Sequence, residues 1–321
     1  MVKLVVNGAA EMADVPGLEA AAERLEIAFA PDPATLAREL PGTEILLGWN
    51  FRGRELPDCW HLADRLKWIH WGGAGVDAVL FPELIESDVV LTNARGVFDR
   101  AMAEYVLGLM LSYAKLLPET FEHQKNRVWK YRRTERLQGT RAVIFGVGSI
   151  ARETAAVLGA VGVEVAGVGR SARSGVPVFG EVHSADAAHD VAAGADWVIG
   201  VLPGTEETRK FFDAAFFAAM KSGARFINIG RGMSVDETAL LAALNSGTIA
   251  GAALDVFTTE PLPADDPLWS APNLIVSPHI SGDYNEYPQD LVAQFLGNVE
   301  RYLSGGALVN VVDKAAGYVR D

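Results

Sequence analysis

Residues 140–170 read TRAVIFGVGSIARETAAVLGAVGVEVAGVGR, and this stretch decides the fold. It starts with unbroken apolar residues at 142–145, the pattern of a strand buried on both faces of a parallel sheet. A glycine-containing turn follows, then an amphipathic stretch at 150–160 and a second apolar run at 164–168. The order strand, turn, helix, strand predicts the βαβ unit that binds a dinucleotide.

The turn itself has the G-x-G-x-x-A spacing, with Gly146, Gly148 and Ala151 at its fixed positions. Gly146 permits the tight turn, Gly148 lets a pyrophosphate approach the backbone, and Ala151 keeps the helix close to the sheet. The backbone N–H groups at the helix start, those of Ser149 and Ile150, are then expected to hold the phosphates.

The whole chain has 321 residues, which is long enough for two domains with sizeable cores. Its net charge of −13 argues against a surface for nucleic acid or anionic membrane. The longest apolar stretch, 101–117, contains Glu104 and Lys115 and is too short and too charged for a membrane span. A single cysteine, Cys59, fits a reducing cytoplasm. No metal site is predicted.

Apolar runs and helical patterns alternate on both sides of the glycine turn, which predicts an α/β fold with doubly wound parallel sheets. The predicted strands are 3–7, 27–30, 44–49, 68–71, 89–92, 197–202, 225–229, 251–255 and 274–276. The predicted helices are 18–26, 33–40, 100–117, 211–220, 237–245 and 289–303, with 118–139 as a polar, basic connection.

A short loop follows the predicted strand at 68–71 and contains Gly73, Ala74 and Gly75. Ligands bind beyond the carboxyl ends of strands in such sheets. The loop is a nest of backbone donors suited to a carboxylate, so these three residues are candidates for substrate binding. Taken alone, the loop is better explained as a plain turn.

The residues after the second strand of the βαβ unit indicate which dinucleotide binds. An NAD site has an acidic residue there, whereas this sequence has Arg170, Ser171 and Arg173. Arginines pair bidentately with a 2′-phosphate. We therefore predict NADP(H) as the preferred cofactor, with NAD(H) possible. The alternative is that both arginines are solvated loop charges.

Three later strands are each followed by a residue suited to reducing a 2-oxo acid: Arg231, Glu260 and His279. The guanidinium suits the substrate carboxylate, and histidine is the proton donor that titrates near neutrality. A carboxylate beside that histidine fixes its orientation. Each residue taken alone also has an explanation without catalysis. Arg231 could be a surface charge, Glu260 a turn residue before proline, and His279 a loop histidine. Together, on one sheet edge, they favour catalysis.

These motifs resemble those of the D-isomer-specific 2-hydroxyacid dehydrogenases. The resemblance extends over most of the chain and rests on Gly146-x-Gly148-x-x-Ala151, residues 228–232 (NIGRG), 254–263 (LDVFTTEPLP), 265–269 (DDPLW), 277–279 (SPH), 73–77 (GAGVD), 91–93 (LTN) and 103–105 (AEY). It departs from the family at Ala151, which close helix packing tolerates, and at Arg170, where many members have Asp. Arginine or serine there is similar to the glyoxylate/hydroxypyruvate reductase branch, which uses NADPH.

The resemblance implies a Rossmann-type cofactor domain, 99–284, inserted in a flavodoxin-like substrate domain, 1–98 plus 285–321. It implies a homodimer joined through the cofactor domains. It also implies that Arg231 binds the substrate, that His279 is the acid/base and that Glu260 is its partner. Asp255 would meet the nicotinamide carboxamide, and Leu202 and Pro203 would line the cofactor cleft.

The first functional hypothesis is thus an NADPH-dependent reductase of small 2-oxo acids such as glyoxylate or hydroxypyruvate, located in the cytoplasm. An alternative is a corepressor-like protein that senses dinucleotides and binds partners. Within the enzymes, an NAD-dependent phosphoglycerate dehydrogenase or another D-2-hydroxyacid dehydrogenase is the rival. The presence of Arg231, Glu260 and His279 together favours an enzyme.

Overall fold

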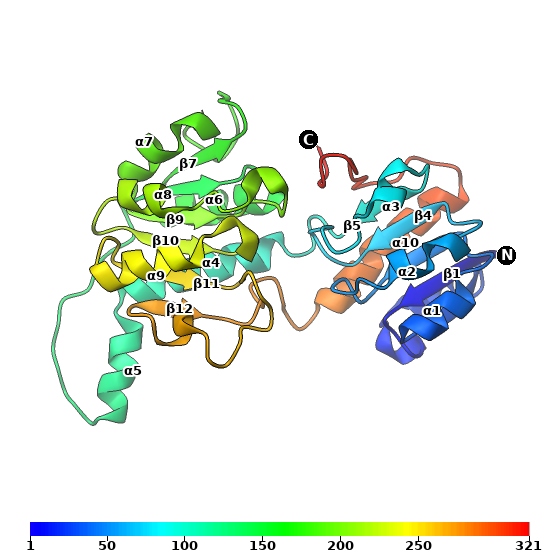
Figure 1. The fold of residues 1–321 in the computed structure, drawn as a ribbon, viewed down its shortest axis with the longest axis horizontal. Helices are drawn as coiled ribbons and strands as arrows, with labels where there is room; N and C mark the ends of the chain where they lie inside the picture. Colours follow the sequence, from blue (N-terminus) through cyan, green and yellow to red (C-terminus); the bar gives the residue numbers. More distant parts are fainter. Residues whose placement is uncertain (321) are drawn as a thin grey trace. The chain divides into compact units, whose positions relative to one another are not determined.

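The computed structural model describes residues 1–320, which form two compact units (Figure 1). The first unit contains Met1–Phe98 and the chain from Tyr284 onward, and the second contains Asp99–Asp283. The second unit is therefore inserted into the sequence of the first.

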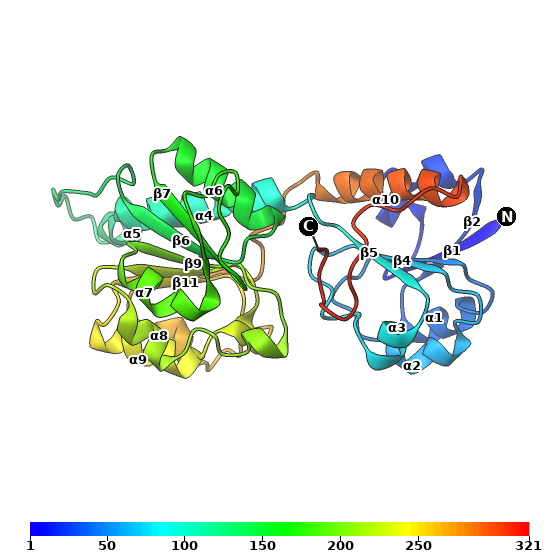
Figure 2. The same cartoon turned by 90° about the horizontal axis from the view of Figure 1, so that it is seen from above.

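The first unit has a parallel sheet of 5 strands in the order β2-β1-β3-β4-β5, the order of flavodoxin-like folds. Its strands are β1 (Val2–Asn7), β2 (Leu25–Ala30), β3 (Ile45–Gly48), β4 (Trp68–Trp71) and β5 (Val90–Asn93). Its helices are α1 (Pro33–Glu39), α2 (Leu56–Cys59), α3 (Pro82–Glu86) and α10 (Tyr287–Leu303). Helix α10 covers one face of the sheet and α1 to α3 cover the other (Figure 2).

The second unit has a parallel sheet of 7 strands in the order β12-β11-β10-β9-β6-β7-β8. The strands are β6 (Arg141–Phe145), β7 (Glu164–Gly169), β8 (Val182–Ser184), β9 (Trp197–Gly200), β10 (Arg225–Asn228), β11 (Gly251–Leu254) and β12 (Leu274–Val276). The helices are α4 (Asp99–Ala114), α5 (Leu117–Lys125), α6 (Ser149–Ala160), α7 (Ala188–Ala193), α8 (Ala214–Ala219) and α9 (Glu237–Ser246). The strand order reverses between β6 and β9, the switch point at which such sheets bind ligands.

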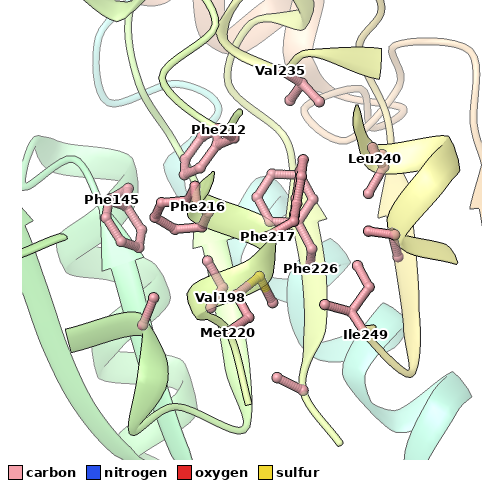
Figure 3. Packing of buried hydrophobic residues seen from close by; sticks show 14 of the residues in the cluster. Phe145, Val198, Phe212, Phe216, Phe217, Met220, Phe226, Val235, Leu240 and Ile249 are labelled. Carbon is pink, nitrogen blue, oxygen red and sulfur yellow. The ribbon is translucent and has the colours of Figure 1, made fainter. Parts of the chain in front are cut away.

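Both faces of this second sheet are covered, as its continuous apolar strands require. Helices α4 and α6 lie on one face, and α7, α8 and α9 lie on the other (Figure 2). Phenylalanine rings fill the second face, where Phe212 lies edge-on to Phe145, Phe216 and Phe226 (Figure 3). These side chains are fully buried, so the sheet edge that holds the candidate site rests on a rigid core.

The predicted fold class, two doubly wound parallel sheets, is confirmed by these two strand orders. Within residues 1–320, no helix combines the length and apolar character that crossing a membrane requires.

Three predicted helices are wrong in extent. The helix predicted at 18–26 is only a 3₁₀ turn, Leu18–Ala21, because the chain already enters β2 at Leu25. The helix predicted at 211–220 shrinks to α8, because Phe212 pairs its backbone with Ser234 and Asp236. Asp213 then caps α8 through its side chain, which accepts the Phe216 N–H.

The helix predicted at 100–117 ends at Ala114, and the predicted connection at 118–139 contains helix α5. Pro118 explains the break, since it has no N–H with which to continue α4. The carbonyl of Ala114 instead accepts the N–H of Glu135, and Leu116 takes a left-handed conformation with φ of 53°.

Candidate active site

The glycine turn has the geometry that a dinucleotide needs. Gly146 has φ of +108°, and a Cβ there would lie 2.7 Å from the carbonyl oxygen of Val201, so no other residue fits without a shift. Helix α6 starts directly after Gly148, which is exposed and leaves open space where a side chain would be. Ala151 is buried in the helix–sheet contact. The N–H groups of Ser149 and Ile150 stand at the helix start, where phosphates bind.

The neighbouring strand ends extend this surface. Leu202 and Pro203 follow β9, and both are half-buried. Gly230, which follows β10, packs on the backbone of Leu202: a Cβ on Gly230 would lie 2.8 Å from the Leu202 nitrogen. The segments after β9 and β10 are therefore held together at the switch point.

Arg170, Ser171 and Arg173 follow β7 as an exposed loop. The loop is anchored on β8, because the Arg173 N–H donates to the carbonyl of Val182 at 2.9 Å and the Ser184 hydroxyl donates to the carbonyl of Arg170 at 3.4 Å. Arg170 thus lies at the carboxyl end of β7, the strand that neighbours β6 and its glycine turn.

His279 and Glu260 form a direct pair. His279 Nδ1 lies 2.7 Å from Glu260 Oε2, and each side chain is 33% exposed. The other carboxylate oxygen, Oε1, accepts the backbone N–H of Phe257 at 2.9 Å. The carboxylate is therefore fixed to its own loop and fixes the imidazole in turn.

The Arg231 segment is fixed by its backbone. The carbonyl of Arg231 accepts hydrogen bonds from the buried side chains of Asn228, at 3.1 Å, and Ser234, at 2.7 Å. One guanidinium nitrogen donates to the carbonyl of Gly230 at 2.8 Å. The half-buried arginine is thus presented from a rigid turn at the end of β10.

Gly232 joins the Arg231 segment to the Glu260 segment. A Cβ on Gly232 would lie 1.9 Å from the carbonyl carbon of Phe257, so the two backbones touch where only glycine fits. Because the Phe257 N–H is bound by Glu260, this contact links the arginine turn to the Glu260–His279 pair.

Asp255 is bound inside the same network. Its side chain is fully buried, and its Oδ1 accepts from the Ser277 hydroxyl at 2.7 Å and from the Ile280 N–H at 3.0 Å. Its Oδ2 accepts the Ser281 N–H at 2.8 Å. Burial raises the pKa of Tyr105 on α4. Sequence reasoning missed this network, although Asp255 and Ser277 directly follow the apolar strands β11 and β12.

The predicted carboxylate loop lies in the other unit, after β4. The side chain of Asn93 donates to the carbonyl of Ala74 at 2.5 Å, and the Ala94 N–H donates to the carbonyl of Gly73 at 3.1 Å. The ring of Phe51 packs against Gly73, with a Cβ there 3.2 Å from the ring. Gly75 completes this ordered loop, and its binding role stays a prediction.

The comparisons with known proteins agree with this geometry. Residues 107–281 match the family model described as "D-isomer specific 2-hydroxyacid dehydrogenase, NAD binding domain". Glyoxylate/hydroxypyruvate reductase B of Pectobacterium carotovorum is 34% identical over 265 residues, covering 78% of this chain and 80% of that protein.

Two solved structures are also similar over nearly the full length. A D-isomer specific 2-hydroxyacid dehydrogenase family protein of Aeromonas salmonicida is 35% identical, with a TM-score of 0.85 and coverage of 98% of this chain and 99% of that chain. The NADPH-dependent glyoxylate/hydroxypyruvate reductase of Sinorhizobium meliloti, in complex with NADP and sulfate, is 30% identical, with a TM-score of 0.85 and coverage of 99% and 100%.

A parallel-sheet dinucleotide fold with a histidine–carboxylate pair beyond the carboxyl ends of its strands is typical of a nucleotide-dependent oxidoreductase. The matches then show that the chain belongs to the D-isomer specific 2-hydroxyacid dehydrogenase family. The family resemblance and the enzyme class predicted from the sequence, an NAD(P)-dependent dehydrogenase, are both confirmed.

Proposed function

We propose that this enzyme reduces small 2-oxo acids with NADPH, converting glyoxylate to glycolate and hydroxypyruvate to its D-2-hydroxy acid. The observation that carries the proposal is the 2.7 Å contact between His279 Nδ1 and Glu260 Oε2. An ionised carboxylate can only accept a hydrogen bond, so Nδ1 carries a proton and Nε2 is left to exchange one with the substrate. The reductase names of the relatives support the substrate class.

When bound, the nicotinamide supplies the hydride that the substrate carbonyl carbon accepts. His279 delivers the proton to the developing alkoxide, and Glu260 holds the imidazole in the required tautomer. Arg231 binds the substrate carboxylate and polarises the carbonyl. The N–H groups after Gly148 hold the phosphates of the cofactor. Leu202 and Pro203 line the nicotinamide side of this surface.

The direct test follows reduced-nicotinamide absorbance after glyoxylate, hydroxypyruvate or a larger 2-oxo acid is added, with NADPH and NADH in parallel. Chiral chromatography then assigns the product formed from hydroxypyruvate or the larger acid, since glycolate has no stereocentre. We expect the fastest oxidation of NADPH with the small acids, and a D product from hydroxypyruvate. If no 2-oxo acid caused oxidation of NADPH or NADH, the proposed reaction would be contradicted. An L product would contradict its stereochemistry.

The preference for NADPH rests on Arg170 and Arg173, the exposed cations after β7. Replacing Arg170 by aspartate is expected to lower kcat/KM for NADPH about 10- to 100-fold, because a charge-assisted hydrogen bond of roughly 1.5–3 kcal/mol is lost. The kcat/KM for NADH should stay the same or rise, since an acidic residue accepts hydrogen bonds from the ribose hydroxyls of NADH. Steady-state kinetics with both cofactors measure the change.

The control for this charge reversal is Arg38→Asp, which makes the same change at an exposed arginine of α1. It should leave both cofactor efficiencies unchanged. A wild-type enzyme that prefers NADH, or an Arg170→Asp variant with unaltered discrimination, would overturn the assignment.

We also infer a homodimer, supported by the segment 117–136, which we term the arm. In the arm, Trp129 is 101% exposed and Tyr131 is 87% exposed, although the polypeptide is hydrogen-bonded to the unit on both sides of them. Figure 1 shows α5 and the loop after it extending away from the sheet. Large aromatic residues left in water are typical of a surface that another protein covers.

Charge indicates that the covering protein is a second copy. The tip of the arm is basic, with the residues Arg127, Lys130, Arg132, Arg133 and Arg136, whereas the whole chain has a net charge of −13. A basic arm is therefore complementary to the acidic body of another copy.

Replacing Trp129 and Tyr131 together by serine is expected to convert the dimer to a monomer, because the two rings supply the apolar centre of the contact. Light scattering after size-exclusion chromatography measures the mass. The matched control is Trp269→Ser, at a 54% exposed tryptophan outside the arm, which should leave the mass unchanged. A wild-type monomer, or a double variant that stays dimeric, would contradict this role of the arm.

We place the enzyme in the cytoplasm within the same proposal. Its single cysteine, Cys59, is a free and buried thiol. Burial raises the pKa of that thiol, which keeps it protonated and unreactive. A protein with this thiol chemistry suits a reducing compartment.

A further inference from the structure

The backbone of His279 is in an unusual conformation. Its φ is +57°, in the left-handed region that residues with a Cβ rarely adopt. Such a conformation persists only when the surrounding structure imposes it, and it is concentrated at functional sites. Some contact must therefore hold the loop 277–281 against its own preference.

The contact is made by one buried side chain. The Asp255 carboxylate binds the Ser277 hydroxyl, two residues before His279, and the N–H groups of Ile280 and Ser281, the two residues after it. Both sides of the strained residue are thus attached to a single anchor. Asp255 is itself fixed at the end of β11, where its N–H donates to the carbonyl of Asn228 at 3.0 Å.

We infer that Asp255 is a positioning residue, whose carboxylate holds the 277–281 loop so that the imidazole of His279 is aimed at the reacting carbonyl. The inference rests on the proposed acid/base role of His279. It gives Asp255 a function that acts through the imidazole, in place of the nicotinamide contact that the family resemblance implies. Glu260 fixes the side chain of His279, and Asp255 fixes its backbone.

The informative variant is Asp255→Asn, which keeps the shape of the side chain. Its amide nitrogen would face an N–H donor, either that of Ser281 or that of Ile280, so one hydrogen bond becomes a donor–donor conflict. A catalytic group displaced by about 1 Å loses on the order of 100-fold in rate. We therefore expect kcat for NADPH oxidation with glyoxylate to fall about 10- to 100-fold, with the Kd of NADPH unchanged.

A double-mutant cycle with His279→Ala separates the two roles of Asp255. If Asp255 acts through the imidazole, then Asp255→Asn changes the residual rate of the His279→Ala enzyme less than about 2-fold. An equal loss in both backgrounds, or a raised Kd of NADPH, would overturn the inference. Wild-type turnover by His279→Ala alone would instead refute the proposed function, so the two failures are distinguishable.

Two further variants keep the inference testable if Asp255→Asn does not fold. Ser277→Ala removes only one of the three hydrogen bonds, should give a smaller loss of kcat, and replaces Asp255→Asn in the cycle if that variant does not fold. The matched control is Asp196→Asn, at a carboxylate of the same unit that binds the Arg141 N–H and Lys221 at the opposite strand ends. Its kcat should equal that of the wild type.

Discussion

Replacing His279 by alanine is expected to lower turnover of a 2-oxo acid about 10²- to 10⁴-fold, the usual contribution of a positioned acid or base. An imidazole can both donate and accept a proton, and the Glu260 contact orients this one. NADPH should still bind, because its predicted contacts lie on the glycine turn and on Arg170. Stopped-flow absorbance gives kcat, and fluorescence titration gives the Kd of NADPH.

His61→Ala is the control for this loss, since His61 is an exposed histidine of the first unit. It should turn over like the wild type. The turnover of Glu260→Gln should lie between those of the wild type and His279→Ala, because glutamine keeps the shape of the glutamate side chain and removes its charge. Wild-type turnover by His279→Ala would show that the proton comes from another group.

Replacing Arg231 by alanine is also expected to lower catalytic efficiency strongly. We expect kcat/KM for the 2-oxo acid to fall about 10²- to 10³-fold, as when one preorganised donor is removed from a developing charge. The turn that presents Arg231 is held by Asn228 and Ser234 through the backbone, so the fold should survive the substitution. Steady-state kinetics over a range of substrate concentrations measure the loss.

Arg231→Lys tests whether charge alone is enough. Lysine keeps the cation and loses the planar fork, so it should restore only part of the activity. Arg209→Ala, at an exposed arginine paired with Glu206, is the control and should leave kcat/KM unchanged. An Arg231→Ala enzyme with undiminished kcat/KM would remove this residue from the site.

Local patterns predicted the framework of the second unit well. The unbroken apolar run before Gly146 predicts a buried parallel strand, and β6 covers Arg141–Phe145. The polar residues after buried strands predicted which segments meet, because parallel strands share their carboxyl edge. That reasoning is enough to bring Glu260 and His279 to one edge, and the structure joins them directly.

Features that depend on contacts between distant segments could not be predicted from local sequence patterns. Phe212 looks helical in sequence but pairs with the chain at Ser234, and tertiary pairing prevailed over its local pattern. His279, with its left-handed conformation, lies between residues that are hydrogen-bonded to Asp255, which is distant in sequence. The exposure of Trp129 could not be predicted either, because a tryptophan in a sequence is ordinarily expected to be buried.

The absence of a side chain at Gly232 has a practical consequence for engineering. Every other amino acid at this position would push against the Phe257 carbonyl and spread the turns that hold Arg231 and Glu260. Mutant libraries that aim to broaden the range of accepted acids should leave codon 232 unchanged. Diversity is better placed on a side chain beside the predicted carboxylate loop, such as Phe51, whose ring packs on Gly73.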